Sequence, residues 1–165
     1  MKKNFKSGVT YPQKIIATLG LILAFIQAAY AVDLNSAVGY WLTIDARTNQ
    51  KSSIIQIWKN PTNNKYYGKI YKIFAEGGHK TSDLCVACHG KQKGRPMLGL
   101  QIISDMVFYD GQYHNGYILD PRDGKKYHAK MTVTKHGQVL KLRGYIGLPL
   151  FGKTTEWQRA SKKLI

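Results

Sequence analysis

The residues best suited to chemistry are the two cysteines of the sequence, Cys85 and Cys88, which a histidine follows directly. The run Cys85-Val86-Ala87-Cys88-His89 matches the Cys-x-x-Cys-His pattern of covalent haem attachment, in which both thiols bind the porphyrin and the histidine is an axial ligand. Haem needs an apolar pocket around the motif, whereas this motif lies in a polar segment. A c-type haem protein is therefore an alternative to the favoured interpretation, which needs no cofactor.

Other interpretations use the cysteines without haem. A thiol-disulfide active protein needs a nucleophilic thiolate at a helix N-terminus, and no helical unit of that kind is predicted around Cys85. A zinc site would need a second pair of ligands, and Cys88 and His89 are adjacent. The favoured interpretation is a disulfide between Cys85 and Cys88, which orders a loop in an oxidising compartment.

The sequence contains no familiar catalytic motif. It has no Gly-x-Ser-x-Gly elbow, no phosphate-binding glycine loop and no His-Glu-x-x-His run. Asp120 and Asp123 form the best carboxylate pair, but the pattern Asp-Pro-x-Asp-Gly is typical of a turn. We therefore predict a protein that is not an enzyme and holds no metal.

The N-terminal segment has the order of features that export machinery recognises. Four lysines precede an apolar run over residues 15–26, and the small-residue triplet Ala29-Tyr30-Ala31 follows. This order predicts a signal peptide at residues 1–31, with cleavage near Ala31. The apolar run is shorter than the about 20 residues that span a bilayer, so a retained anchor is the less favoured alternative. We expect residues 32–165 to be one domain, periplasmic or secreted.

The charge of the chain is strongly positive, with 25 Lys and Arg against 9 Asp and Glu. A hydrophobic fraction of 44% excludes a disordered polycation. Nucleic acid would attract such charge, but export removes the protein from it. Lysines also alternate with apolar residues, as in Lys69-Ile70-Tyr71-Lys72, which is typical of a solvated sheet face. We expect no nucleic-acid partner and favour an anionic membrane surface.

Short β-rich segments follow one another from Val38 onward, separated by turn residues. Eight strands without helical cover avoid exposed edges most simply by closing into a barrel. We therefore expect an all-β antiparallel meander of about eight strands, with one long cysteine-containing loop from Ala75 to Arg95. The predicted strands are Gly39–Asp45, Ser52–Trp58, Tyr66–Phe74, Met97–Ile103, His114–Leu119, Lys126–Thr134, Gln138–Ile146 and Thr154–Arg159.

Several motifs lie along these strands and their connections: Gly39-Tyr40-Trp41-Leu42, Tyr67-Gly68-Lys69-Ile70, Cys85-Val86-Ala87-Cys88 with Gly90, Leu119-Asp120-Pro121 with Gly124-Lys125-Lys126-Tyr127, Leu142-Arg143-Gly144-Tyr145-Ile146-Gly147, and Phe151-Gly152-Lys153-Thr154 before Trp157-Gln158-Arg159. Together they resemble the bacterial exported family called domain of unknown function 2147, over Val38 to Ala160. The resemblance implies a lipocalin-like barrel with no established reaction. In the lipocalin signature a Gly-x-Trp places the Trp at one barrel end, beneath a basic side chain from the last strand. Trp41 and Arg159 fit these structural positions.

An eight-stranded barrel encloses room for side chains or for one small ligand. Apolar residues at alternate positions predict an interior face with ligand-binding residues Leu42, Ile44, Ile55, Ile57, Ile70, Phe74, Leu140 and Leu142. Glycines inside strands, at Gly68, Gly116 and Gly144, are expected to leave room for a ligand or to allow a bend.

Basic residues are expected to meet the polar end of such a ligand. The candidates are Lys91, Lys93 and Arg95 on the long loop, and Arg143 if it points inward. We therefore predict a protein that carries or senses a small apolar or amphiphilic ligand, anionic and fatty-acid-like, without chemical change. A filled barrel with a structural or interaction role is the alternative.

Overall fold

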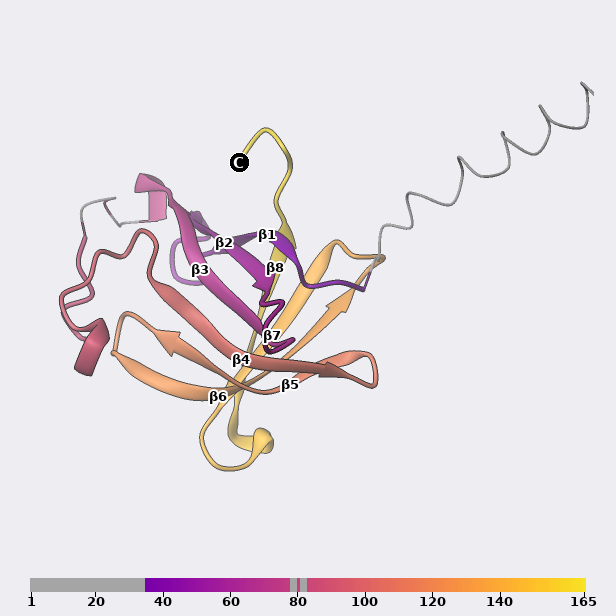
Figure 1. Ribbon diagram of the computed structural model, residues 1–165. Coiled ribbons are helices and arrows are strands. Elements are labelled where there is room, and N and C mark those ends of the chain that lie inside the picture. The colour runs from indigo at the N-terminus through magenta and orange to yellow at the C-terminus, as the bar shows by residue number, and fades with distance from the viewer. Residues whose placement is uncertain (1–34, 78–79, 81–82) are drawn as a thin grey trace, which may run out of the picture. The chain divides into compact units, whose positions relative to one another are not determined.

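The computed structural model describes residues 35–77, 80 and 83–165, so the predicted signal peptide lies outside the described residues. Each strand is antiparallel to the next, and β8 also pairs with β1, which closes the barrel (Figure 1). The predicted all-β meander is thereby confirmed. The strands are β1 (Gly39–Ile44), β2 (Lys51–Lys59), β3 (Tyr66–Ile73), β4 (Gln101–Tyr109), β5 (Gln112–Asp120), β6 (Lys125–Thr134), β7 (Val139–Tyr145) and β8 (Lys153–Arg159).

The connections between strands fall into two groups because neighbouring strands run in opposite directions. Those from β1 to β2, β3 to β4, β5 to β6 and β7 to β8 lie at one end of the barrel, called the mouth below. The long β3–β4 connection carries the short helical turns η2 (Ala75–Gly77) and η3 (Gly90–Gln92), and the β7–β8 connection carries η4 (Pro149–Phe151). The remaining connections lie at the opposite, closed end.

Strand β4 differs most from its predicted bounds, because it begins at Gln101 and runs to Tyr109 instead of covering Met97–Ile103. Its centre holds Asp105 with a φ of 61°, a left-handed conformation that is uncommon in strands. The carboxylate of Asp105 accepts hydrogen bonds from Lys65 Nζ at 3.3 Å and Tyr67 Oη at 3.2 Å. Because Asp105 is charged and left-handed, it interrupts the alternation of polar and apolar residues, and the sequence pattern therefore does not predict the full length of β4.

Trp41 anchors the closed end of the barrel. Its side chain is fully buried, and its indole Nε1 donates a 2.7 Å hydrogen bond to the carbonyl of Ala37. The guanidinium carbon of Arg159, at the end of β8, lies 4.2 Å from the centre of the Trp41 ring. The structure thus places this pair where the sequence predicts it, and the contact joins the first strand to the last.

The guanidinium of Arg159 also binds the chain on either side of the seam. It donates from Nε to the carbonyl of Gly137, from Nη2 to that of Ser36 at 2.8 Å, and from Nη1 to that of Val38 at 3.2 Å. Burial lowers the pKa of Arg159 from its usual value. Gly39 has a φ of +128°, and a Cβ there would lie 3.0 Å from Nη1, which explains the glycine of the Gly-x-Trp motif.

The closed half of the barrel is filled by its own side chains. A Cβ on Gly116 would collide with the side chain of Met106, and one on Gly68 would lie 2.9 Å from Ile103. Met106 and Ile103 are completely buried. Of the two expectations for Gly68 and Gly116, room for a ligand was therefore wrong, because larger side chains from β4 occupy that volume. The strand pairing shifts register at both glycines, which fits the alternative of a bend.

Replacing Arg159 tests how much the closed end depends on this contact. Arg159→Ala should lower the free energy of unfolding by about 3 kcal/mol, because it removes the cation–π contact and leaves three carbonyls, two of them in partly buried hydrogen bonds, without this donor. Urea denaturation measures the change. The control is Lys141→Ala, which removes an exposed ion pair with Glu156 and should cost less than about 1 kcal/mol. Equal losses in the two variants would contradict the assigned role.

Candidate ligand-binding cavity

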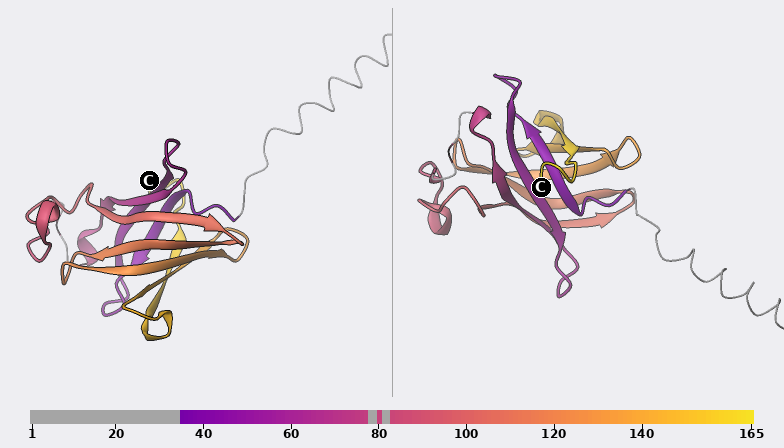
Figure 2. Two further views of the ribbon diagram at one scale, coloured as in Figure 1. Left: turned by 60° about the horizontal axis from the view of Figure 1, so that its bottom comes forward. Right: turned by 90° about the horizontal axis from the view of Figure 1, so that it is seen from above.

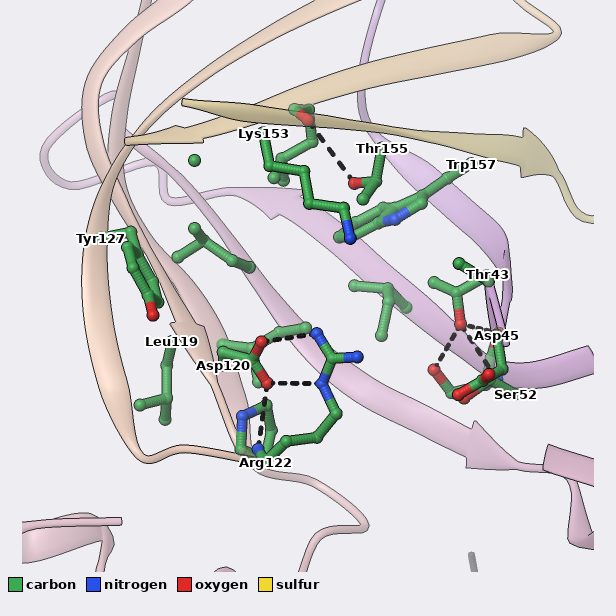
Figure 3. A pocket seen from close by; sticks show the side chains of 18 of the residues that line it. Thr43, Asp45, Ser52, Leu119, Asp120, Arg122, Tyr127, Lys153, Thr155 and Trp157 are labelled. Carbon is green, nitrogen blue, oxygen red and sulfur yellow. Dashed lines mark hydrogen bonds and ion pairs between the residues drawn. The ribbon is translucent and has the colours of Figure 1, made fainter. Parts of the chain in front are cut away.

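The mouth half of the barrel contains a cavity of about 520 Å³ (Figure 3). This volume lies within the range of about 300–1,000 Å³ that is usual for small-molecule sites. Its floor and walls are mainly apolar, and they include Ile55, Ile70, Ile73, Ile102, Ile118 and Leu142, with Trp157 from β8. The barrel is therefore filled at one end and hollow at the other.

A bulge in β3 determines which residues reach the cavity. Ile54 pairs with Lys72 and Ile55 pairs with Ile70, so Tyr71 is an extra residue on β3. As a result, Ile70 and Ile73 both line the cavity although they are three residues apart. Strict alternation from Ile70 would instead select Lys72.

Some of the residues predicted to face the interior lie where the sequence places them. Ile44, Ile55, Ile70 and Leu142 line the cavity. Ile57 and Leu140 are buried in the same apolar core but do not line the cavity. Gly144 lines the cavity, although Ile118 Cγ2 would lie 3.2 Å from an added Cβ.

Two residues that were predicted to face the interior, Leu42 and Phe74, do not line the cavity. Leu42 follows Trp41, which packs in the core, so Leu42 lies on the opposite face of β1, where it is buried and pairs with Ile54. Phe74 follows the bulge of β3 and does not line the cavity, and Lys72 Nζ lies 5.5 Å from its ring centre.

The basic residues that were predicted to meet the polar end of the ligand do not line the cavity. Lys91 and Arg95, like Lys93, are exposed on the cysteine loop and do not line the cavity. Arg143 donates from Nε to the carbonyl of Pro149 at 2.7 Å and from Nη2 to that of Leu150 at 3.0 Å. It therefore binds the β7–β8 connection from outside the cavity.

Arg122 and Lys153 are the basic residues that do line the cavity, and in Figure 3 their side chains extend into it from opposite sides. Arg122 donates from Nε to Asp120 at 3.0 Å and from Nη2 to the same carboxylate at 2.6 Å. Burial disfavours the charge on Asp120, but these hydrogen bonds and the positive charge of Arg122 prevail and lower its pKa. The Nζ of Lys153 has no hydrogen bond or ion pair within the described residues.

The sequence contained a signal for Lys153 that our prediction missed. Lys153, Thr155 and Trp157 alternate along β8 and all line the cavity. Arg122 gave a weaker signal, since it lies in a turn whose position at the mouth follows from the strand order alone.

The cysteine pair forms the predicted disulfide, and both sulfurs lie in the buried core. Each cysteine is only 1% exposed, so the bonded sulfurs are shielded from solvent. The cysteine loop packs on the β5–β6 turn, where a Cβ on Gly124 would collide with the carbonyl of Ala87. The disulfide therefore supports the turn that carries Arg122.

Neither a metal cluster nor a membrane-spanning helix is found among the described residues. No three His, Cys, Asp or Glu side chains in that part of the chain are placed to hold a metal ion. No helix there is long and apolar enough to cross a membrane.

Residues 39–159, from the start of β1 to the end of β8, match the family described as "Uncharacterized protein conserved in bacteria (DUF2147)". The chain belongs to this family. Protein HP1028 from the human pathogen Helicobacter pylori, described as belonging to the lipocalin family, has a similar structure with a TM-score of 0.65. The two are 21% identical over 78% of this chain and 86% of that chain, so the likeness concerns the fold. No curated protein matches the chain.

These comparisons confirm the resemblance inferred from the motifs and the lipocalin-like fold of this family member. The family description gives no reaction. A barrel of this fold with an apolar cavity at its mouth is suited to binding a small molecule.

The contact between the cysteine loop and the β5–β6 turn can be tested at Gly124, which has a φ of +69°. Gly124→Ala should destabilise the protein by about 3 kcal/mol, because the Ala87 carbonyl occupies the position of the new methyl group. Gly111→Ala is a matched control with a φ of +71° and no atom within 4 Å of the added Cβ, so it should cost only about 1 kcal/mol of backbone strain. Equal losses of melting temperature in the two variants would contradict the contact between Gly124 and Ala87.

The β1–β2 turn at the cavity rim predicts an acid-sensitive contribution to stability. The Asp45 carboxylate accepts hydrogen bonds from the backbone and side chain of Arg47 and from the backbone of Thr48, which lowers its pKa to about 2 from 3.8. A lowered pKa stabilises the folded state above about pH 4, and the contribution is lost as the pH falls towards 2. The melting temperature of Asp45→Asn should therefore lie below that of the wild type near neutral pH and approach it near pH 2. A constant difference across this range would contradict the assignment.

Proposed function

We propose that the protein binds one small anionic amphiphile, with its apolar part in the barrel and its charged group between Lys153 and Arg122, and that it carries or senses this ligand without chemical change. The observation that carries the proposal is a cavity with mainly apolar walls, lined also by Lys153 and Arg122, in which each of the lining carboxylates is already ion-paired. The overall class, a small-ligand binding barrel, fits the lipocalin-like fold. The ligand chemistry comes from the residues of this chain alone.

The two cations have different roles in this proposal. Two nitrogens of Arg122 are held by Asp120, which fixes the plane of the guanidinium and leaves Nη1 without a partner in the described residues. The lining also holds the carboxylates Asp45, Asp120 and Glu156, and each forms an ion pair, with Arg47, Arg122 and Lys141 respectively. Lys153 is therefore the charged lining residue that has no ion pair within the described residues. A carboxylate or phosphate between Lys153 and Arg122 would accept charge-assisted hydrogen bonds.

The apolar walls define the rest of the ligand. Against Ile55, Ile70 and Leu142 a polar molecule such as a sugar would lose its hydration without replacement, and the lining hydroxyls of Thr43, Ser53 and Thr155 compensate only part of the surface. An alkyl chain loses no hydrogen bonds there and gains from leaving water. These walls therefore favour an alkyl chain over a polar metabolite.

The test is a titration with dodecanoic acid and with its uncharged alcohol, followed by the fluorescence of Trp157, which lines the cavity. The acid should bind about tenfold more tightly than the alcohol, equivalent to about 1.4 kcal/mol. Lys153→Met should remove most of this preference while leaving the affinity for the alcohol unchanged. Lys141→Met, a change on the outer face of β7, should retain the preference.

A second variant separates the cavity from the rim. Thr155 lines the cavity from β8, so Thr155→Trp should weaken both ligands by reducing the available volume. Failure of the wild-type protein to bind either ligand would overturn the proposal, as would binding that Thr155→Trp leaves unchanged.

A further inference from the structure

The β7–β8 connection carries four large apolar side chains in solvent. The exposed fractions are 66% for Ile146, 64% for Leu148, 79% for Leu150 and 76% for Phe151. These four residues are called the lip below. In Figure 2 (left) this connection projects beyond the strands at the bottom of the view. Such a cluster on one short connection indicates a surface that binds a partner.

The main chain of the lip is hydrogen-bonded within the protein although its side chains are exposed. Arg143 binds the carbonyls of Pro149 and Leu150, and its Nη1 donates to Thr154 Oγ1 at 2.9 Å. The backbone N–H of Phe151 donates to the carbonyl of Leu148 at 3.1 Å, which closes the turn η4. A lip held by its main chain loses little conformational entropy when its side chains are buried against a partner.

Lysines lie beside the lip. Residues 146–152 contain no charged residue, and Lys153 follows them directly. Lys125 and Lys126 line a surface hollow together with Ile146. Residues 35–165 as a whole carry 21 Lys and Arg against 8 Asp and Glu. A second copy of the chain would bring the same charge to the contact, whereas an anionic surface would complement it.

We propose that the lip is a membrane-docking site, in which Leu148, Leu150 and Phe151 enter the interface of an anionic lipid bilayer while the neighbouring lysines contact lipid phosphates. Exposed apolar side chains flanked by lysines are the combination that binds such an interface. This docking goes beyond the binding function proposed above and does not require it.

The position of the lip gives the docking a consequence for ligand exchange. Ile146 and Phe151 line the cavity as well as belonging to the lip, so the cavity rim and the docking surface are continuous. An amphiphile could pass between bilayer and barrel without crossing water. This consequence, unlike the docking itself, rests on the proposed function.

The docking is tested by sedimentation with vesicles of phosphatidylcholine containing about 30% phosphatidylglycerol, compared with phosphatidylcholine alone. The protein should bind the anionic vesicles, and added salt should weaken the binding. Leu148→Ser combined with Leu150→Ser should raise the lipid concentration for half-binding by about tenfold or more. These two residues do not line the cavity, so the variant should keep the ligand affinity of the wild type. An intact ligand affinity therefore separates failure of docking from failure of the proposed function.

A control variant removes exposed apolar surface at the closed end. Val107 and Tyr109 are 36% and 55% exposed near the β4–β5 turn, and Val107→Ser combined with Tyr109→Ser should change half-binding by less than about twofold. All proteins are purified in the same form with the same N-terminus, so residues outside the described range contribute equally. An equal loss in both variants, or no wild-type binding to anionic vesicles, would overturn the proposal.

A label on the lip keeps the test decisive if the double variant is unstable. Leu150→Cys labelled with an environment-sensitive fluorophore should brighten and shift to the blue on anionic vesicles, whereas the same label at Tyr109→Cys should not change. Sedimentation velocity without lipid tests the alternative, in which a second copy of the chain binds the lip. A dimer that the lip substitutions dissociate would assign the lip to a second copy and overturn membrane docking.

Discussion

The contact between Arg159 and Trp41 is the interaction on which the closed barrel depends. The seam between β1 and β8 is a short ladder in which Trp41 pairs with Arg159 and Leu42 pairs with Gln158. So few backbone hydrogen bonds hold two strands weakly, and the strands between them are joined only to their neighbours in sequence. Arg159 strengthens the seam by binding the indole face and three carbonyls from the segment before β1 and the β6–β7 turn. One side chain thus joins the two ends of the meander.

With the closed end fixed, the same barrel can be solid in one half and hollow in the other. In the closed half each in-strand glycine faces a larger side chain from a neighbouring strand, as Gly116 faces Met106. At the mouth the inward positions hold medium-sized residues such as Ile55 and Leu142, and the two bulges near this end spread the strands. The long cysteine loop and the β5–β6 turn then form part of the rim. The cavity is therefore a product of side-chain size and strand irregularity, and strand number alone does not decide it.

The sequence predicted the parts of this structure that depend on local pattern. Turn residues and alternation predicted the strands, the expectation of export predicted the disulfide, and the Gly-x-Trp motif predicted the seam. The prediction failed where the alternation of inward and outward residues along a strand is interrupted. The bulge at Tyr71 changes which residues of β3 face inward, and Asp105 interrupts β4 with a left-handed backbone.

The rim was predicted less well than the strands because its residues depend on tertiary position. Lys91 and Arg95 lie on the cysteine loop, as predicted, but this loop packs with its disulfide in the core and leaves both cations exposed to solvent. Lys153 was predictable from its alternation with Trp157. The pairing of Arg122 with Asp120 required the geometry of a folded turn.

Arg143 shows how the β7–β8 connection can keep its shape independently of its side chains. Its guanidinium binds the carbonyl oxygens of Pro149 and Leu150, and every amino acid possesses such a carbonyl. Its side-chain acceptor among the described residues is the hydroxyl of Thr154. Substitution of Leu148, Leu150 or Phe151 therefore leaves these hydrogen bonds in place. Within a family that keeps the arginine, the side chains at the positions of Leu148 and Leu150 are free to diverge from one member to the next without changing the lining of the cavity.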